Sequence, residues 1–358
     1  MKVYISDYSA VKADRHYDKG IYDLAYEAYK QISPSVESKG LDTLIISSSF
    51  SLHNNLNLGV KVASKIGIPA KRIVNVEGGL SSSGQALMVA ESMIKSGLAS
   101  SVLILGVEKV NDNVSKKVNR MLSYELDSLY EGFYGVNSTE IAALIHKSYM
   151  RKYKVSKEYF YSWPLLMHAR AQSNPKACLP FKVTREAISS SQDISSPLKL
   201  FDLSPLCDGA ASAFLTSEFR GKGIELMSIG VTNYFDNYWD MEKINYVVKS
   251  SFNQSLENAK ISKEEVSLLE ITDSYSVMAA LELEATGLYE QGKSLEQVES
   301  NSKVNLGGGL KARGNIMGAT GLYQLHDALN GLNKGEIGVI INTSLLAHTS
   351  YSIVVKNE

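Results

Sequence analysis

The pattern of apolar and polar residues repeats once along the chain. Residues 72–107 give a short extended segment, a Gly/Ser loop, a helix, a glycine turn and a β-rich apolar strand, and residues 303–343 follow the same order. In the first copy, apolar residues surround most of the helix at 86–94, which is typical of a helix buried on nearly all sides. The apolar run at 102–105 predicts a central strand, and the corresponding strand of the second copy is predicted at 337–341.

A second pair of segments supports this internal repeat. Strand-like runs at 41–49 and 266–274 each follow a helix-like stretch, at 21–32 and at 251–260, and each precedes its glycine loop. The pattern of each half therefore predicts a β–α–β–α–β unit with right-handed crossovers. Two such α/β halves, stacked together, are the expected fold class.

Residues 112–200 fit neither half. They contain helix-like runs at 139–153 and 157–172, followed by a polar, Ser-rich stretch. We expect an inserted loop domain folded over one end of the sheets, where binding sites are often found. The predicted domains are an N-terminal half at 1–222, which includes this insertion, and a C-terminal half at 223–358.

Composition and charge exclude several classes of protein. The 358 residues are 44% apolar and 21% charged, as in a globular protein with a core. Lys and Arg number 37 against 38 Asp and Glu, which argues against a general nucleic-acid-binding surface. Two cysteines cannot form a disulfide framework and predict a cytoplasmic protein. Since no stretch approaches the roughly 18 consecutive apolar residues of a membrane helix, no membrane contact is expected.

Two glycine loops have the spacing of a phosphate-binding loop but not its chemistry. The loops at 79–84 and 309–314 are followed by Gln85-Ala86 and Asn315-Ile316, not by the Lys and Ser/Thr that hold phosphate and magnesium. No His or Cys pair has the spacing of a metal site. We therefore expect neither a metal nor a resident cofactor.

Several of these segments together resemble the thiolase superfamily, and specifically its archaeal and sterol-carrier-protein-type branch. They are VEGGLSSSGQAL at 76–87, GVEK at 106–109, SPLKLFD at 196–202 with CDGAA at 207–211, and the glycine-rich run at 307–321. The resemblance covers nearly the whole chain. It implies a five-layered αβαβα fold, usually a homodimer, and CoA or acyl-CoA as a ligand.

The same resemblance places unusual residues at the catalytic positions. Leu80 stands where the family has its nucleophilic cysteine, and a leucine cannot form a thioester. Thr272 and Asn315 stand where the family has histidines. Because such groups act as a unit, ordinary Claisen condensation is not expected. The loops around these positions predict a substrate pocket formed by Gly79, Ser81, Gly314, Met317, Gly318 and His348.

Other residues are weaker candidates for chemistry. Cys178 and Cys207 fit small buried residues better than nucleophiles, and the serines at 81–83 fit helix caps better than nucleophiles. Basic residues of the insertion are candidates for CoA phosphates, although solvated surface charge is the commoner role. These residues are Lys116, Lys117, Arg120, Arg151, Lys152 and Arg170.

Three functions remain open at this point. The first is a non-thiolytic acyl-CoA-binding or scaffolding subunit, since the archaeal branch assembles with a zinc-ribbon/OB-fold protein of the DUF35 type and with hydroxymethylglutaryl-CoA synthase. The second is a thiolase-fold retro-aldolase for a β-hydroxyacyl-CoA, with Tyr275 and Tyr351 as candidate acid or base. The third is acetyl-CoA C-acetyltransferase, the activity that the resemblance alone would assign.

Overall fold

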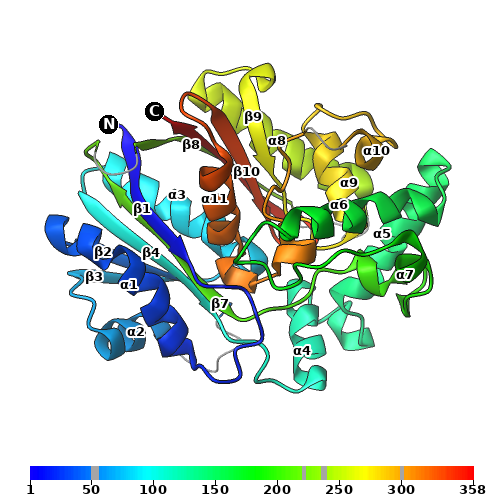
Figure 1. Cartoon of the computed structure of the whole chain (residues 1–358), viewed down its shortest axis with the longest axis horizontal. Coiled ribbons are helices and arrows are strands. Elements are labelled where there is room, and N and C mark those ends of the chain that lie inside the picture. Colours follow the sequence, from blue (N-terminus) through cyan, green and yellow to red (C-terminus); the bar gives the residue numbers. More distant parts are fainter. Residues whose placement is uncertain (50–55, 220–222, 235–239, 299–301) are drawn as a thin grey trace.

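A single large sheet runs through the protein. The computed structural model describes residues 1–49, 56–219, 223–234, 240–298 and 302–358. In these residues nine strands form the order β3-β2-β4-β7-β1-β8-β11-β10-β9 (Figure 1). Their bounds are β1 Val3–Ala10, β2 Thr43–Ser47, β3 Arg72–Val76, β4 Ser101–Glu108, β7 Gly209–Thr216, β8 Ile224–Asn233, β9 Val266–Glu270, β10 Ile337–Thr343 and β11 Thr349–Asn357.

The sheet consists of two similar halves that meet at β1 and β8, which pair antiparallel. In the sheet, β7, β4 and β2 lie in this order outward from β1, and β11, β10 and β9 lie in this order outward from β8. The pairings also correspond: β4–β7 and β10–β11 are antiparallel, whereas β2–β4 and β9–β10 are parallel. The repeat read from the apolar pattern is therefore present in the strand order.

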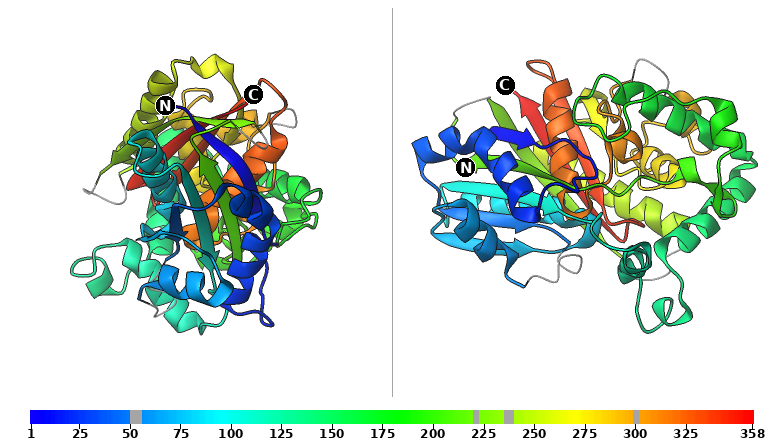
Figure 2. Two further views of the ribbon diagram at one scale, coloured as in Figure 1. Left: turned by 90° about the vertical axis from the view of Figure 1, so that its left-hand side faces the viewer. Right: turned by 60° about the horizontal axis from the view of Figure 1, so that its bottom comes forward.

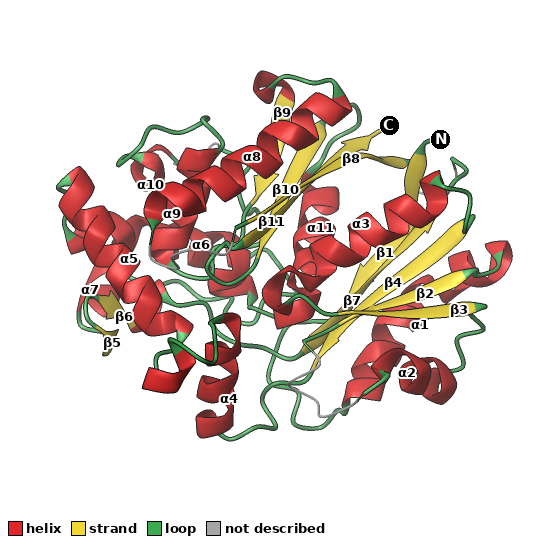
Figure 3. Cartoon of the chain, turned by 180° about the vertical axis from the view of Figure 1, so that it is seen from behind, coloured by secondary structure: helices red, strands yellow, loops and turns green. Residues whose placement is uncertain are grey.

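Helices separate and cover the two halves (Figure 3). α3 and α11 lie between them and contact strands of both, while α1 and α2 cover the N-terminal half and α8 covers the C-terminal half, with α9 packed beside it. The layers thus run α, β, α, β, α. The bounds are α1 Ile21–Lys39, α2 Leu58–Ile66, α3 Ser82–Lys95, α8 Met241–Ala259, α9 Ser276–Ala285 and α11 Thr320–Gly331.

Small residues allow the two central helices to approach closely. A Cβ atom added at Gly321 of α11 would lie 2.7 Å from the Cβ of Ser83 in α3, which is closer than van der Waals contact permits. The same atom would also lie 2.7 Å from the side-chain oxygen of Asn342 in β10. This close contact brings the N-terminal ends of both helices to one region of the molecule.

The segment between β4 and β7 forms the insertion, which lies beside the strand ends (Figure 2). The helix predicted at 139–153 is confirmed as α5, and Asn137 caps it by accepting from the backbone N–H of Thr139 at 2.8 Å. The run predicted at 157–172 divides into a 3₁₀ turn and α6, with Pro164 in the first turn of the α-helix. The elements are α4 Ser115–Leu122, α5 Ser138–Tyr153, α6 Ser162–Ala171, α7 Arg185–Ser189, β5 Asp193–Ser195 and β6 Leu198–Lys199.

Throughout the described part of the chain, no helix is long and apolar enough to cross a membrane.

Candidate functional site

A pocket of about 240 Å³ lies at the N-terminal end of α3. Both halves and the insertion contribute to its wall. Three of the residues predicted from the sequence, Gly79, Met317 and His348, are among those that line it. The lining comprises Ser49, Glu77, Gly78, Gly79, Met121, Tyr124, Glu125, Met317, Ser344, His348 and Thr349.

Leu80 lies in the 3₁₀ turn Gly79–Ser81 that leads into α3. Its side chain is fully buried and belongs to the hydrophobic core. Its backbone N–H, however, points toward a carboxylate oxygen of Glu125. The amide of Leu80 therefore faces Glu125, which lines the pocket, while the hydrocarbon side chain packs into the core.

Glu125 holds this turn to the loop between β10 and β11. It ends the 3₁₀ turn Ser123–Glu125 of the insertion. One carboxylate oxygen accepts from the N–H of Leu80 at 3.3 Å, and the other accepts from the N–H of Leu345 at 3.3 Å. A Cβ atom at Gly79, whose φ is +57°, would overlap the Glu125 carboxyl, so both the space and the backbone conformation require glycine there.

The pocket contains a carboxyl group and an imidazole with shifted pKa values. Burial raises the pKa of Glu125 from 4.5 to about 7; the N–H groups of Leu80 and Leu345 lower it, and the charge of Glu77 raises it. Burial also lowers the pKa of His348 from 6.5 to about 4. At neutral pH the imidazole is therefore uncharged, and Glu125 exchanges a proton in the physiological range.

The two positions that the resemblance matches to histidines are tied into the backbone. The Thr272 hydroxyl donates to the carbonyl of Ile341 at 3.0 Å, and the Asn315 side-chain oxygen accepts from the N–H of Met317 at 3.0 Å. The Asn315 amide group also donates to the Ser204 hydroxyl at 3.2 Å. Neither Thr272 nor Asn315 is among the residues that line the pocket.

A buried amide chain links Leu80 to Thr272. The Asn342 amide donates to the carbonyl of Leu80 at 3.3 Å and to the Gln324 side-chain oxygen at 3.1 Å. Gln324 in turn donates to the Thr272 hydroxyl at 3.4 Å. The structure thus brings these two predicted positions together through hydrogen bonds that stabilise the turn, outside the pocket lining.

The remaining predicted loop residues lie behind the pocket wall. The Ser81 hydroxyl donates to the Gly78 carbonyl at 2.8 Å. The Gly318 carbonyl accepts from the hydroxyls of Ser47 and Ser83, at 2.5 and 2.6 Å. Gly314 packs on Cys207, so that an added Cβ would lie 2.8 Å from the sulfur. None of these three predicted residues, Ser81, Gly314 and Gly318, is among the lining residues.

The two candidate tyrosines are separated and buried. The Tyr275 hydroxyl lies 3.2 Å from the Thr139 hydroxyl, next to α5. Tyr351 lies in β11 and packs against Gly84 of α3, where an added Cβ would lie 2.6 Å from the Tyr351 Cβ. Burial raises the pKa of both phenols. Neither tyrosine is among the residues lining the pocket.

Both cysteines are free thiols near the loop at 312–315. The N–H of Cys178 donates to the carbonyl of Arg313 at 2.8 Å, and the N–H of Cys207 donates to that of Asn315 at 2.8 Å. Neither thiol is at the pocket or at the Leu80 turn.

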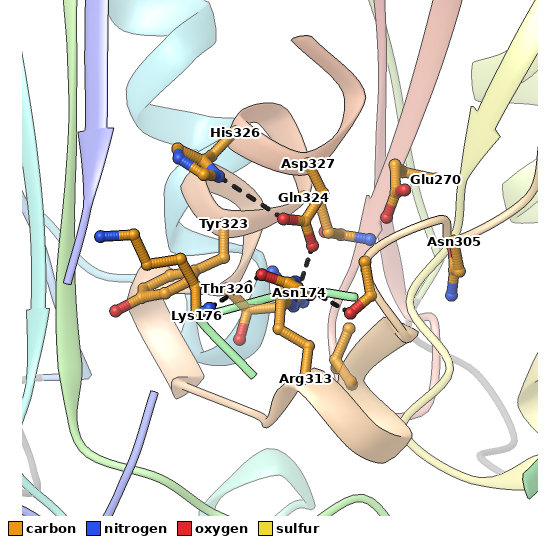
Figure 4. Close-up of polar contacts among 12 residues, drawn as sticks. Asn174, Lys176, Glu270, Asn305, Arg313, Thr320, Tyr323, Gln324, His326 and Asp327 are labelled. Atoms are coloured by element: carbon orange, nitrogen blue, oxygen red, sulfur yellow. Dashed lines mark hydrogen bonds and ion pairs between the residues drawn. The ribbon is translucent and has the colours of Figure 1, made fainter. Parts of the chain in front are cut away.

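A buried charged cluster that includes Glu270, Arg313 and Asp327 lies at the glycine-rich loop (Figure 4). Asp273 accepts from the N–H of Leu310 at 2.7 Å, and Arg313 lies 3.4 Å from the carboxylate of Asp327 in α11. Burial raises the pKa of neighbouring Glu270 well above its usual value. Arg170, one of the candidates for CoA phosphates, donates to the carbonyl of Ser302 at 2.7 Å.

Comparison with known families identifies two matching regions. The family described as "Thiolase, N-terminal domain" matches residues 12–193, and the family described as "Thiolase C-terminal domain-like" matches residues 236–339. The acetyl-CoA acetyltransferase of Methanocaldococcus jannaschii is 27% identical over 350 residues, covering 90% of this chain and 88% of the relative. That of Methanothermobacter thermautotrophicus is 28% identical over 293 residues, covering 77% and 75%. Sterol carrier protein 2 of Gallus gallus is 26% identical over 305 residues, which are 76% of this chain but 55% of the relative.

Solved structures share the fold at low sequence identity. The Acat5 thiolase from Ascaris suum, in complex with coenzyme A, matches with a TM-score of 0.79 and 17% identity, covering all of both chains. The Ltp2-ChsH2(DUF35) aldolase matches with a TM-score of 0.81 and 16% identity, covering 99% of this chain and 98% of that one. Both matches agree with the five layers described above.

Proposed function

Because the chain belongs to the thiolase family, we propose that it is a non-thiolytic member that binds an acyl-CoA without forming an acyl-enzyme. The buried hydrocarbon side chain of Leu80 is the observation that carries this proposal. Acyl transfer to the protein requires a thiolate at this turn, where the helix N-terminus stabilises it. The chain's two thiols, Cys178 and Cys207, lie elsewhere, which supports the same conclusion.

We propose further that the protein acts as a subunit, together with a zinc-ribbon/OB-fold protein of the DUF35 type. The fold shared with the Ltp2-ChsH2(DUF35) aldolase supports this partner. A homodimer is proposed as well, because β3 is the edge strand of the sheet and its unpaired backbone can pair with a second copy. The two free thiols are consistent with the reducing cytoplasm as the proposed location.

Ligand binding and acyl transfer can be measured separately. We expect calorimetry to detect acetyl-CoA binding, while intact-mass spectrometry detects no acyl adduct and acetoacetyl-CoA is not cleaved by free CoA. The Leu80→Cys variant is the matched control, because it supplies the missing thiol at the same turn. An acyl adduct on the wild-type chain would contradict the proposal and favour acetyl-CoA C-acetyltransferase, the activity named for the archaeal relatives.

The partner is tested by co-expression with a DUF35-type protein. A stable complex that purifies together and raises the affinity for acetyl-CoA is the expected result. If the two proteins elute separately at micromolar concentrations, the subunit proposal is wrong. Acyl-CoA binding by the isolated chain is decided separately, by the calorimetry described above.

A second candidate is a retro-aldolase acting on a β-hydroxyacyl-CoA. The pocket carboxyl of Glu125, with its pKa of about 7, favours it, because this reaction needs a base and not a nucleophile. The base removes the β-hydroxyl proton, the Cα–Cβ bond breaks, and a carbonyl product and a thioester enolate form; the enolate then takes up a proton.

The aldolase candidate also keeps Tyr275 and Tyr351 as proposed acid or base residues. The measurement is release of an aldehyde or ketone from a β-hydroxyacyl-CoA in the presence of the DUF35-type partner. Loss of turnover in Tyr351→Phe or Tyr275→Phe, with binding retained, would support that tyrosine. Full activity in both variants would remove both from the mechanism.

A further inference from the structure

Glu125 occupies a place that suits an external ligand. The N–H groups of Leu80 and Leu345 converge on one carboxylate at the N-terminal end of a buried helix. Convergent backbone donors at a helix N-terminus typically bind a carbonyl or carboxylate oxygen of a ligand. In this structure the occupant comes from the protein's own insertion.

The surroundings hold the Glu125 segment in place without holding the carboxyl group tightly. Met121 packs with Val110 and Met317, and Leu126 packs in the same core cluster as Leu80. Both anchors are buried, whereas Glu125 between them is partly exposed and lines the pocket. Displacement of the carboxyl group into the pocket would therefore leave these hydrophobic anchors in place.

The charged groups around Glu125 do not include a cation among the described lining residues. Glu77 faces it from the loop after β3, neutral His348 from the loop after β10, Tyr275 from the start of α9, and Tyr124 is its neighbour in the chain. The carboxylate is thus held by two backbone donors at 3.3 Å each, near the long limit of a hydrogen bond.

We propose that Glu125 is a displaceable internal occupant of an acyl-oxygen site formed by the N–H groups of Leu80 and Leu345. The thioester carbonyl oxygen of the ligand takes these two donors after the carboxyl group has left. The identity of the ligand rests on the proposed function, whereas the two-amide site and its internal occupant do not. Binding is then coupled to release of Glu125, which makes this residue a regulator of the site.

Removing the side chain tests the site with a small probe. In Glu125→Ala, formate should bind saturably to the vacated amides and raise the melting temperature, while the wild type and the surface control Glu264→Gln show no such shift. Acetyl-CoA should bind Glu125→Ala about tenfold more tightly than the wild type, since no displacement is needed. Absence of both effects in folded Glu125→Ala overturns the proposal.

The two probes distinguish the possible failures. If formate binds Glu125→Ala but acetyl-CoA binds no variant, the internal occupant stands and the acyl-CoA part of the proposed function fails. Should Glu125→Ala not fold, Glu125→Gln keeps the shape without the charge. Because release of the carboxyl favours its ionised form, wild-type affinity for acetyl-CoA should rise several-fold from pH 6 to pH 8 relative to that of Glu125→Gln. Equal pH profiles would overturn the proposal.

Discussion

The equivalent ends of α3 and α11 are each held by a glutamate from a distant segment, but in different ways. At α11, Glu108 of β4 is fully buried, and one of its oxygens accepts from the N–H of Gly318 at 3.1 Å, the hydroxyl of Ser48 at 3.3 Å and the N–H of Ser49. At α3, Glu125 accepts from one N–H per oxygen at 3.3 Å and lines a pocket.

The difference follows from where each glutamate is attached. Glu108 is the last residue of β4, an interior strand, and it is fully buried among three donors, so its contacts are structural. Glu125 belongs to the insertion, outside the sheet, and faces open volume. The duplicated scaffold therefore supplies two similar helix ends, and only the end reached by the insertion is suited to exchange its occupant for a ligand.

The largest expected effect is a difference in the free energy of unfolding between the alanine variants of the two glutamates. Glu108→Ala leaves three buried donors without this acceptor, and each such loss costs about 1–3 kcal/mol, so we expect about 3–5 kcal/mol of destabilisation in urea unfolding. Glu125→Ala removes the acceptor of two N–H groups at a pocket where Glu125 is only half-buried, so it should cost less, about 1–2 kcal/mol. Glu108→Gln keeps an acceptor and should recover part of the loss. Equal costs for the two alanine variants would break the comparison.

The next effect compares the glycines beside each glutamate. A Cβ at Gly318 would lie 2.7–2.8 Å from backbone atoms of Ser48 and Ser49, so Gly318→Ala should destabilise by about 2–3 kcal/mol. Gly79→Ala should cost about 1–2 kcal/mol, from its positive φ and from expelling Glu125.

A double-mutant cycle checks this second expectation. Because the side chain that Gly79→Ala displaces is absent in Glu125→Ala, the combined cost should be lower than the sum by about 0.5–1 kcal/mol. Strict additivity in thermal or urea unfolding would show that Glu125 does not press against Gly79 in solution.

A smaller effect appears in the pH dependence of stability. The folded-state pKa of Glu125 is about 7, above its usual 4.5, so the folded protein binds this proton more tightly than the unfolded chain. Its contribution is present below about pH 4.5 and is lost as the pH rises to about 7. Since Glu125 as a whole residue is only half-buried, we expect a loss of about 1–2 kcal/mol. Glu125→Gln should lack this loss in unfolding experiments at pH 5 and pH 8, and Glu264→Gln should keep it.

The smallest effect concerns the serine beside Leu80. Ser81→Ala removes one hydrogen bond to the Gly78 carbonyl and should cost about 0.5–1.5 kcal/mol, with acetyl-CoA affinity unchanged. Loss of ligand binding in a stably folded Ser81→Ala would instead place the hydroxyl in the site.

The sequence predicted the architecture better than it predicted the site. Both sheet halves repeat the same apolar periods, so α3, β4, α11 and β10 were identifiable from pattern alone. Glu125 was not identified, because it meets Leu80 across 45 residues and its segment has no periodic pattern. Gly79 is the local residue that reflects this contact, because the Glu125 carboxyl lies where a Cβ atom of residue 79 would be. From the sequence, however, this glycine indicated only a tight loop.

Resemblance located positions without giving their contacts. It identified Asn315 and Thr272, yet their side chains bond to nearby backbone, which depends on loop conformations that residue types do not determine. The helix predicted at 157–172 was divided for a different reason: Tyr159 and Phe160 are buried in the core by a tighter turn before α6 begins. In both cases tertiary contacts decided the local structure.

The position of α3 and α11 between the two halves has a consequence for folding. Each helix contacts strands of both halves, so neither half can bury its inner sheet face when the other is absent. Apolar surface of that extent would remain in water in either fragment. Despite its duplicated plan, the chain should therefore unfold in one all-or-none transition, and cutting it between β7 and β8 should yield two insoluble pieces and not two autonomous modules.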